Sequence, residues 1–119
     1  MSRTPRPPKH PGVWFYDTLF PPLQIAVAEA AKQLGMPRET FSRFINGHTR
    51  VNAAMACRLA EWLRLYYPTA TAESWLQRQA EYDLWQVRQK PVVGVTPFVP
   101  QRHRAVQYPL DFGPLEPMA

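Results

Sequence analysis

Five polar side chains between residues 38 and 46 could hydrogen-bond to the edges of DNA bases. They are Arg38, Glu39, Ser42, Arg43 and Asn46. Long, forked or amide side chains on a helix can read the major groove, and an arginine that bonds both acceptors of guanine contributes about 1–3 kcal/mol of discrimination. Glu39 could accept a hydrogen bond from the amine of cytosine. We therefore expect these five residues to read bases from the outward face of one short helix.

A polar loop follows this helix and contains His48, Thr49 and Arg50. Side chains of these types can hold backbone phosphates, and phosphate contacts position a protein on DNA without specifying its sequence. We expect these three residues to contact phosphates.

Two short helices must position the base-reading side chains. The first has apolar residues at helical spacing, namely Val27, Ala30, Ala31 and Leu34. Gly35 follows the last of them, where a helix commonly ends in a left-handed residue. Pro37 suits the first position of the second helix, because the missing N–H of proline needs no partner there. The second helix is expected to bury Phe41, Phe44 and Ile45.

Together these features between residues 27 and 47 predict a helix-turn-helix, whose second helix enters the major groove. One alternative is a helical hairpin whose charged face is only solvated. The agreement of glycine turn, apolar stripe and basic face favours DNA binding over that alternative. RNA binding through the same face is a further alternative, which the deep, narrow major groove of duplex RNA disfavours.

An aromatic helix over residues 12–20 is expected before this motif. It can place Leu19 in the core together with Trp14 or Phe15, which leaves Tyr16 or Val13 partly exposed. The prolines at 21 and 22 should end it.

A further helix is expected to begin near Asn52, which can cap it. Its apolar residues at helical spacing are Ala56, Leu59, Ala60 and Leu63. Cys57 is the single cysteine, so an internal disulfide is excluded. We expect it to pack as a small apolar residue, in preference to acting as a redox switch.

The last helix is expected over residues 72–90, capped by Thr71 and stopped by Pro91. A mixed aromatic face on it consists of Trp75, Gln79 and Tyr82, which could form a dimer interface or could cover the core of its own chain. The predicted fold class is therefore all-α, with five helices.

Both ends of the 119-residue chain differ in composition from residues 12–90, which we expect to form one domain. Residues 1–11 form a basic, proline-rich arm in which Arg3, Arg6 and Lys9 could reach a minor groove, although a disordered terminus is the simpler interpretation. Residues 91–119 are rich in proline and also apolar, so we expect them to lie extended against a surface of the same dimer or of a partner. Residues 92–95 could add a short edge strand.

Catalytic, metal and cofactor sites are not expected. His10, His48 and His103 are far apart and have no carboxylate or thiol partners at ligand spacing. No nucleotide-binding motif, nucleophile setting or pocket for a small ligand can be identified from the residues, so an enzyme is disfavoured. The net charge of +5 favours an anionic partner such as nucleic acid. Without a long apolar run, the protein is expected to be soluble and cytoplasmic, and associated with the nucleoid when bound to DNA.

Several motifs in order resemble the HigA antitoxins, small helix-turn-helix proteins related to phage Cro and C1 repressors in the XRE family. They are His10-Pro11-Gly12, Leu34-Gly35-Met36-Pro37, Ile45-Asn46-Gly47, Arg58-Leu59-Ala60, Trp75-Leu76 and Tyr82-Asp83-Leu84. The chain departs from the family at Ala26, where a capping Ser or Thr is usual, and in continuing well beyond residue 84.

The resemblance implies a Cro/C1-like fold and a homodimeric repressor of its own operon, which binds an inverted repeat in double-stranded DNA. It also implies neutralisation of a HigB-type toxin ribonuclease, and places the last helix in or near the dimer interface. Two alternatives remain open: a solitary transcriptional regulator without a toxin, or a protein-interaction module that acts through its aromatic helix and apolar tail.

Overall fold

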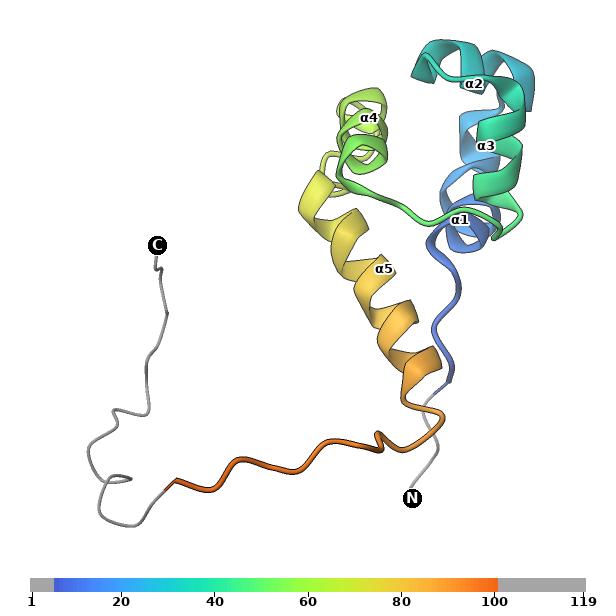
Figure 1. The fold of residues 1–119 in the computed structure, drawn as a ribbon. Coiled ribbons are helices and arrows are strands. Elements are labelled where there is room, and N and C mark those ends of the chain that lie inside the picture. The colour runs from blue at the N-terminus through green and yellow to red at the C-terminus, as the bar shows by residue number, and fades with distance from the viewer. Residues whose placement is uncertain (1–5, 101–119) are drawn as a thin grey trace.

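The computed structural model describes residues 6–100, and all regular elements in this range are helical (Figure 1). The helices are α1 (Pro11–Trp14), α2 (Val27–Leu34), α3 (Arg38–Ile45), α4 (Ala53–Leu63) and α5 (Ala72–Val87). A π-helical turn, Phe15–Leu19, continues α1, and a 3₁₀ turn, Pro21–Leu23, follows it. The predicted all-α class with five helices is confirmed.

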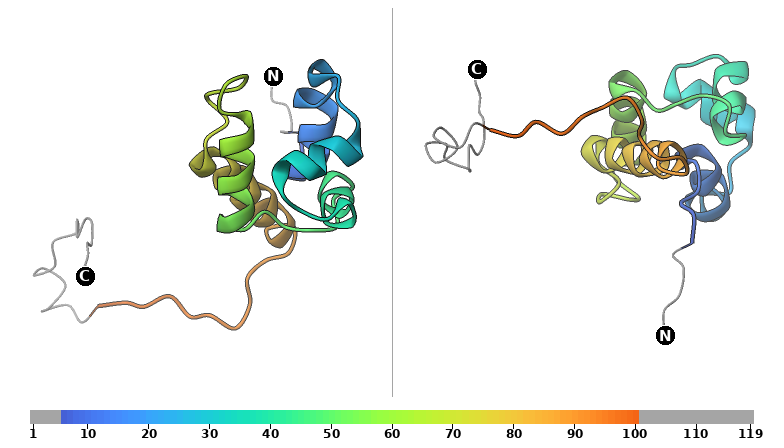
Figure 2. Two further views of the ribbon diagram at one scale, coloured as in Figure 1. Left: turned by 90° about the horizontal axis from the view of Figure 1, so that it is seen from above. Right: turned by 60° about the horizontal axis from the view of Figure 1, so that its bottom comes forward.

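The helices form two groups around a common aromatic core (Figures 1 and 2). Helices α4 and α5 pack against each other on one side, and α1, α2 and α3 lie on the other. Trp75 of α5 inserts between the groups, with its ring 5.9 Å from that of Phe15 and 6.2 Å from that of Phe44, both edge to face. Edge-to-face pairs of this kind add to the stabilisation that burial itself provides. The core therefore ties α5 directly to the helix-turn-helix.

The turn between α2 and α3 has the predicted geometry. Gly35 adopts a left-handed conformation with φ of 73°, its N–H donates to Lys32 at 3.1 Å, and the N–H of Met36 donates to Ala31 at 3.1 Å. These two bonds close a Schellman motif, which only a residue tolerant of positive φ allows at low cost. Arg58 of α4 donates to the carbonyl of Leu34 at 3.0 Å and so satisfies another orphan group at this helix end.

The starts of α2, α4 and α5 agree with the sequence, and that of α3 does not. The side chains of Asn52 and Thr71 cap α4 and α5 as predicted, whereas Ala26 offers α2 no side-chain acceptor. The placement of Pro37 at the first helical position was wrong. Its ψ of 145° is extended, so it is the N-cap of α3, and its carbonyl accepts the N–H of Phe41 at 3.1 Å.

The aromatic first helix buries Phe15 completely, while Tyr16 is 43% exposed, in accord with one of the two expected arrangements. Its regular part ends at Leu19, one residue earlier than predicted. The wider π turn brings Phe20 round to the core, where it is 8% exposed.

The expectation that Cys57 packs in the core was wrong, because its side chain is exposed. Helix α4 buries Met55, Ala56, Leu59 and Leu63. A residue directly after Ala56 lies about 100° further round the helix, on its solvent side.

Residues 88–100 also differ from expectation. Helix α5 ends at Val87 instead of residue 90, and residues 91–100 leave the helices as an extended, exposed segment (Figures 1 and 2). Within this segment no strand forms, and it is exposed beside the helices of its own chain. That it lies against a second copy or a partner, or adds an edge strand there, stays a prediction. Apolar side chains expected to contact a surface in residues 101–119 lie outside the described residues.

None of the helices in residues 6–100 has the length and hydropathy needed to cross a bilayer.

Candidate nucleic-acid interface

Helix α3 presents its polar face to solvent because its opposite face is anchored in the core. Phe41 and Phe44 are fully buried and Ile45 is 8% exposed. Of the five side chains predicted to read bases, Arg38, Glu39, Arg43 and Asn46 are exposed and Ser42 is half-buried. They share one surface, although Asn46 is the C-cap residue after the helix and not part of it.

Two of these side chains are held at the C-terminal end of α3. The Asn46 amide donates to the Ser42 carbonyl at 2.8 Å, and the Arg43 guanidinium donates to the His48 carbonyl at 3.2 Å. Arg38 and Glu39 stand in the first turn, and the described part of the chain provides neither with a hydrogen bond. A positive charge in the first turn opposes the helix dipole, so Arg38 is not placed there to stabilise α3.

The loop after α3 is fixed from two directions. The ring of His10, at the start of α1, donates from Nε2 to the carbonyl of Thr49 at 2.8 Å. From α5, Gln79 Oε1 accepts the buried N–H of Val51 at 2.7 Å. The residues expected to bind phosphates therefore lie on a braced loop.

Arg50 forms an ion pair with Asp83 of α5, which in turn accepts a hydrogen bond from Gln79 at 2.9 Å. The Arg50 side chain is 67% exposed. Pairs this exposed contribute only about 0–1 kcal/mol to stability, so the guanidinium can leave Asp83 for another anion at small cost. His48 is exposed and Thr49 half-buried on the same loop.

His10 has a structural role that the sequence did not indicate. It is only 7% exposed, and its Nδ1 accepts the N–H of Gly12 at 2.9 Å, which makes it the N-cap of α1. With Nδ1 accepting and Nε2 donating to Thr49, the neutral ring is satisfied at both nitrogens. Burial holds the pKa of His10 below its ordinary value of 6.5, with His48 and Arg50 acting in the same direction, against the opposing effects of Thr49 and Asp83.

Acid is therefore expected to destabilise the fold through His10. Below pH 6.5 the unfolded chain binds a proton at this ring that the folded chain does not, so the unfolding free energy falls as the pH drops from 6.5 towards the lower pKa of the folded state. Urea denaturation at pH 7.5 and 5.5 measures the difference, with both pH values chosen to be about a unit from the ordinary pKa. His10→Asn should reduce this pH dependence. Equal pH dependence in the variant and the unchanged protein would contradict the role of His10.

Gly12 permits the contact between α1 and α3. A Cβ atom added there would lie 1.7 Å from the backbone carbonyl oxygen of Phe44, in the last turn of α3. Two backbones can approach this closely only where one residue lacks a side chain. The position of the end of α3 therefore depends on this glycine.

Gly12→Ala is expected to lower the unfolding free energy by about 1–3 kcal/mol, because the obstructing atom belongs to the backbone and α1 must move. Gly94→Ala is the control, since a Cβ there would meet nothing within 4 Å. Its φ of 81° disfavours alanine, but Gly94 lies in the exposed segment after α5, where a local change of backbone leaves the helical core as it is. Chemical denaturation of both variants measures the effect. If Gly12→Ala were as stable as Gly94→Ala, the close contact would not exist in solution.

The basic arm is described only from residue 6, so Arg3 lies outside the described residues. Arg6 is exposed. Lys9 forms an ion pair with Asp17 at 2.8 Å, and its side chain is 55% exposed. The structure therefore turns Lys9 towards the first helical segment of its own chain.

The face of α5 for which a dimer interface and the covering of its own core were both left open covers its own core. Trp75 is 1% exposed, Gln79 is 3% exposed and Tyr82 is half-buried against the ring of His10 at 5.3 Å. Trp75 and Gln79 consequently cannot meet a second copy. Four exposed apolar residues of α5 follow one another on a different face at helical spacing, and they are Leu76, Ala80, Leu84 and Val87. Trp85 is also exposed, outside this spacing.

No group of three or more potential metal-binding side chains occurs within residues 6–100. His10 is fully engaged in the hydrogen bonds given above, His48 is exposed and His103 lies outside the described residues.

The sequence is similar to a virulence-associated protein and to a transcriptional regulator. Virulence-associated protein A' of Dichelobacter nodosus is 39% identical over 80 residues, which span 67% of this chain and 65% of that protein. The uncharacterized HTH-type transcriptional regulator YbaQ of Escherichia coli strain K12 is 34% identical over 88 residues, 73% of each protein. This chain belongs to the family of HTH-type transcriptional regulators.

A solved structure extends the comparison to three dimensions. The antitoxin HigA of Pseudomonas aeruginosa, solved with the higBA promoter, superposes with a TM-score of 0.60 and 27% identity over 69% of this chain and 84% of its own. This superposition confirms the predicted likeness of the HTH-type regulator to HigA. Regulators of this family are not enzymes. No protein-family model matches the chain.

Proposed function

We propose that this HTH-type regulator is a sequence-specific repressor that binds double-stranded DNA through α3. The observation that carries the proposal is the exposed polar face of α3 on a helix anchored by buried Phe41 and Phe44. In this arrangement Arg38 and Glu39 enter the major groove first, followed by Ser42 and Arg43. The likeness to a HigA solved with promoter DNA supports it.

The loop after α3 then contacts the DNA backbone. His48, Thr49 and Arg50 are the proposed phosphate-binding residues, and Arg50 exchanges its ion pair with Asp83 for a phosphate. Asn46 is proposed to contact a base only after releasing Ser42, because its amide donates to that residue in the free chain.

A homodimer would place two copies of α3 in successive major grooves about 34 Å apart, on an inverted repeat. We assign its interface to the exposed apolar stripe on α5, which contains Leu76, Leu84 and Val87, with 38%, 45% and 66% of their surfaces exposed. Light scattering tests this assignment, since Leu84→Glu would place a charge in the interface and should shift a dimer to a monomer.

The likeness to HigA also leads us to propose that the protein represses its own operon and neutralises a HigB-type toxin ribonuclease. A growth assay tests the second part: co-expression with the product of a neighbouring toxin-like gene should restore growth that the toxin alone arrests. If no such gene neighbours this one, the solitary-regulator alternative gains support.

One observation favours protein binding as a second function. The side chains of Val92, Val93, Val95, Phe98 and Val99 are 70–85% exposed in the segment after α5. Apolar groups gathered this closely at a surface commonly mark a partner site. We propose that this segment is the contact for a protein partner such as the toxin.

DNA binding itself is tested with the purified protein and its own upstream DNA in a gel-shift titration. A discrete complex on this DNA, and none on a scrambled duplex of equal length and composition at the same salt concentration, is expected.

A further inference from the structure

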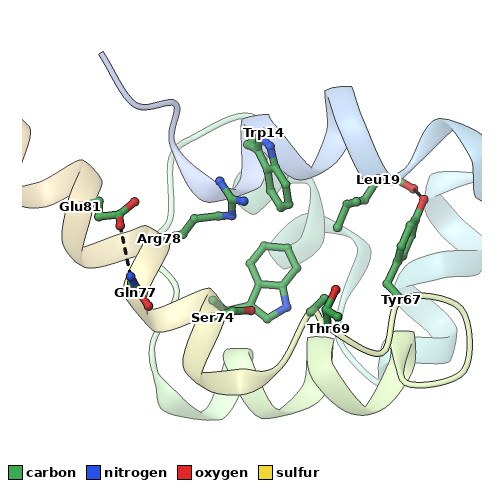
Figure 3. Close-up of a pocket in the computed structure, with 10 residues that line it drawn as sticks. Trp14, Leu19, Tyr67, Thr69, Ser74, Gln77, Arg78 and Glu81 are labelled. Carbon is green, nitrogen blue, oxygen red and sulfur yellow. Dashed lines mark hydrogen bonds between the residues drawn. The ribbon is translucent and has the colours of Figure 1, made fainter. Parts of the chain in front are cut away.

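A cavity of about 390 Å³ lies between the first helical segment and α5, away from the exposed face of α3 (Figure 3). Trp14 and Leu19 line one side of it, Tyr67 closes one end, and Trp75, Arg78 and Glu81 of α5 line the other side. This volume is within the range of small-molecule sites, which are largely apolar with a few fixed polar groups. The proposed DNA and dimer contacts leave it unused.

Arg78 lines this cavity, and its guanidinium N–H groups are free to donate hydrogen bonds. Its guanidinium carbon lies 3.3 Å from the centroid of the Trp14 ring, in a cation–π contact. No acceptor for its N–H groups is found in the described chain, and no carboxylate there lies within ion-pair distance of it. Burial lowers the pKa of Arg78 from its ordinary value, against the influence of Glu81, but an arginine remains charged at neutral pH.

The nearest acidic side chain does not neutralise Arg78. Glu81 lines the same cavity, but its carboxylate accepts a hydrogen bond from Gln77 at 3.4 Å (Figure 3). A guanidinium that is stacked and half-buried without an anion is free to take one, and a carboxylate is the partner that its fork geometry fits best.

A second unused donor borders the cavity. The indole nitrogen of Trp75 is buried and has no hydrogen-bond partner in the described residues. Buried donors normally have a partner, and an orphaned one calls for an explanation. Because Trp75 lines the cavity, an acceptor that reached this nitrogen would supply one.

We propose that this cavity binds a small organic carboxylate with an aromatic or other apolar body. The carboxylate pairs with Arg78, and the body lies against Leu19 and the two indole rings. Trp14 belongs to the same short helix as Gly12, which packs against the end of α3. A ligand bound in the cavity would therefore also change the affinity for DNA. That second part rests on the proposed repressor function, whereas binding itself does not.

Isothermal titration of the purified full-length chain, in the absence of DNA, tests the site. The probes are phenylacetate, 3-phenylpropionate and indole-3-acetate, each compared with its neutral amide. We expect saturable binding of at least one acid with a Kd of about 1 mM or tighter, and binding of its amide that is about tenfold weaker or more. Quenching of tryptophan fluorescence should accompany it, since Trp14 and Trp75 line the cavity.

Two substitutions locate the site. Arg78→Gln should weaken binding of the acid about tenfold and leave the amide unaffected, and Trp14→Phe should weaken both while retaining an aromatic packing group. Arg64→Gln is the matched control, because Arg64 is exposed at the end of α4 and pairs with Glu61.

Absence of saturable binding for all three acids, equal affinity for acids and amides, or an Arg78→Gln variant with unchanged affinity would each overturn the proposal. DNA titrations with and without the bound acid then measure the second part. If DNA affinity is unchanged while calorimetric binding persists, the carboxylate site stands and only its regulatory role fails.

Discussion

Trp75→Ala is expected to lower the unfolding free energy by about 3–5 kcal/mol, the usual cost of removing a buried tryptophan. The side chain is 1% exposed and contacts the rings of Trp14, Phe15 and Phe44. Small domains are stable by about 5–15 kcal/mol in total, so this loss would leave the chain close to unfolding. Urea denaturation followed by circular dichroism measures it.

Two further variants make this prediction specific. Trp85→Ala changes the same residue type on the same helix, but Trp85 is 36% exposed, so this variant should lower the unfolding free energy much less. Trp75→Phe should be tolerated better than Trp75→Ala, because it keeps a ring in the core and removes the unpartnered indole nitrogen. Equal losses for Trp75→Ala and Trp85→Ala would mean that α5 does not insert between the helix groups.

Arg38→Ala is expected to weaken binding to the protein's own operator about 5- to 150-fold, the equivalent of about 1–3 kcal/mol, and to relax the preference at one base pair. The thermal stability should stay constant or rise slightly, since Arg38 opposes the dipole of α3 and no hydrogen bond to it is present in residues 6–100. Fluorescence anisotropy on a panel of single-base operator variants measures the effect.

Arg50→Ala provides the contrast for this experiment, because a phosphate contact should weaken binding to all sequences alike and reduce the salt dependence. Arg64→Ala removes the same charge at the end of α4, outside the proposed interface, and should change the affinity for DNA little. The assignment of Arg38 fails if its removal lowers affinity for the operator and its variants by one common factor.

Local sequence rules predicted the helix-turn-helix because its determinants are close together in the chain. Gly35 is the residue that a left-handed helix end requires, and the spacing of Phe41, Phe44 and Ile45 identifies the buried side of α3. Asn52 and Thr71 cap their helices with bonds that span three residues. Such signals need no knowledge of tertiary packing.

The bracing of the loop after α3 could not be predicted in this way. His10 reaches Thr49 across 39 positions, and Gln79 reaches Val51 across 28. In the sequence His10 looked like one of three scattered histidines, and Gln79 looked like part of an interface. The His10-Pro11-Gly12 motif was the available signal, but only the contact of Gly12 with Phe44 explains why these residues occur together.

Cys57 was misplaced because its residue type was followed in preference to its spacing, which sets it apart from Ala56 and Leu59 on the buried side of α4. On α5 the spacing of apolar residues does not indicate which of two apolar faces meets the core. On α5 the face with Trp75 packs inside and the face with Leu76 and Leu84 remains exposed. The cavity at Arg78 was missed for a similar reason, because Trp14 and Arg78 are brought together only by folding.

The central claim, that this HTH-type regulator recognises a particular DNA sequence through α3, is tested most directly by comparing its own upstream DNA with a scrambled duplex across a salt series. We predict a preference of about a thousandfold or more that persists at physiological salt. Equal and weak binding to both duplexes, with Kd values of about 10⁻⁴ to 10⁻⁶ M that rise together with salt, would contradict it.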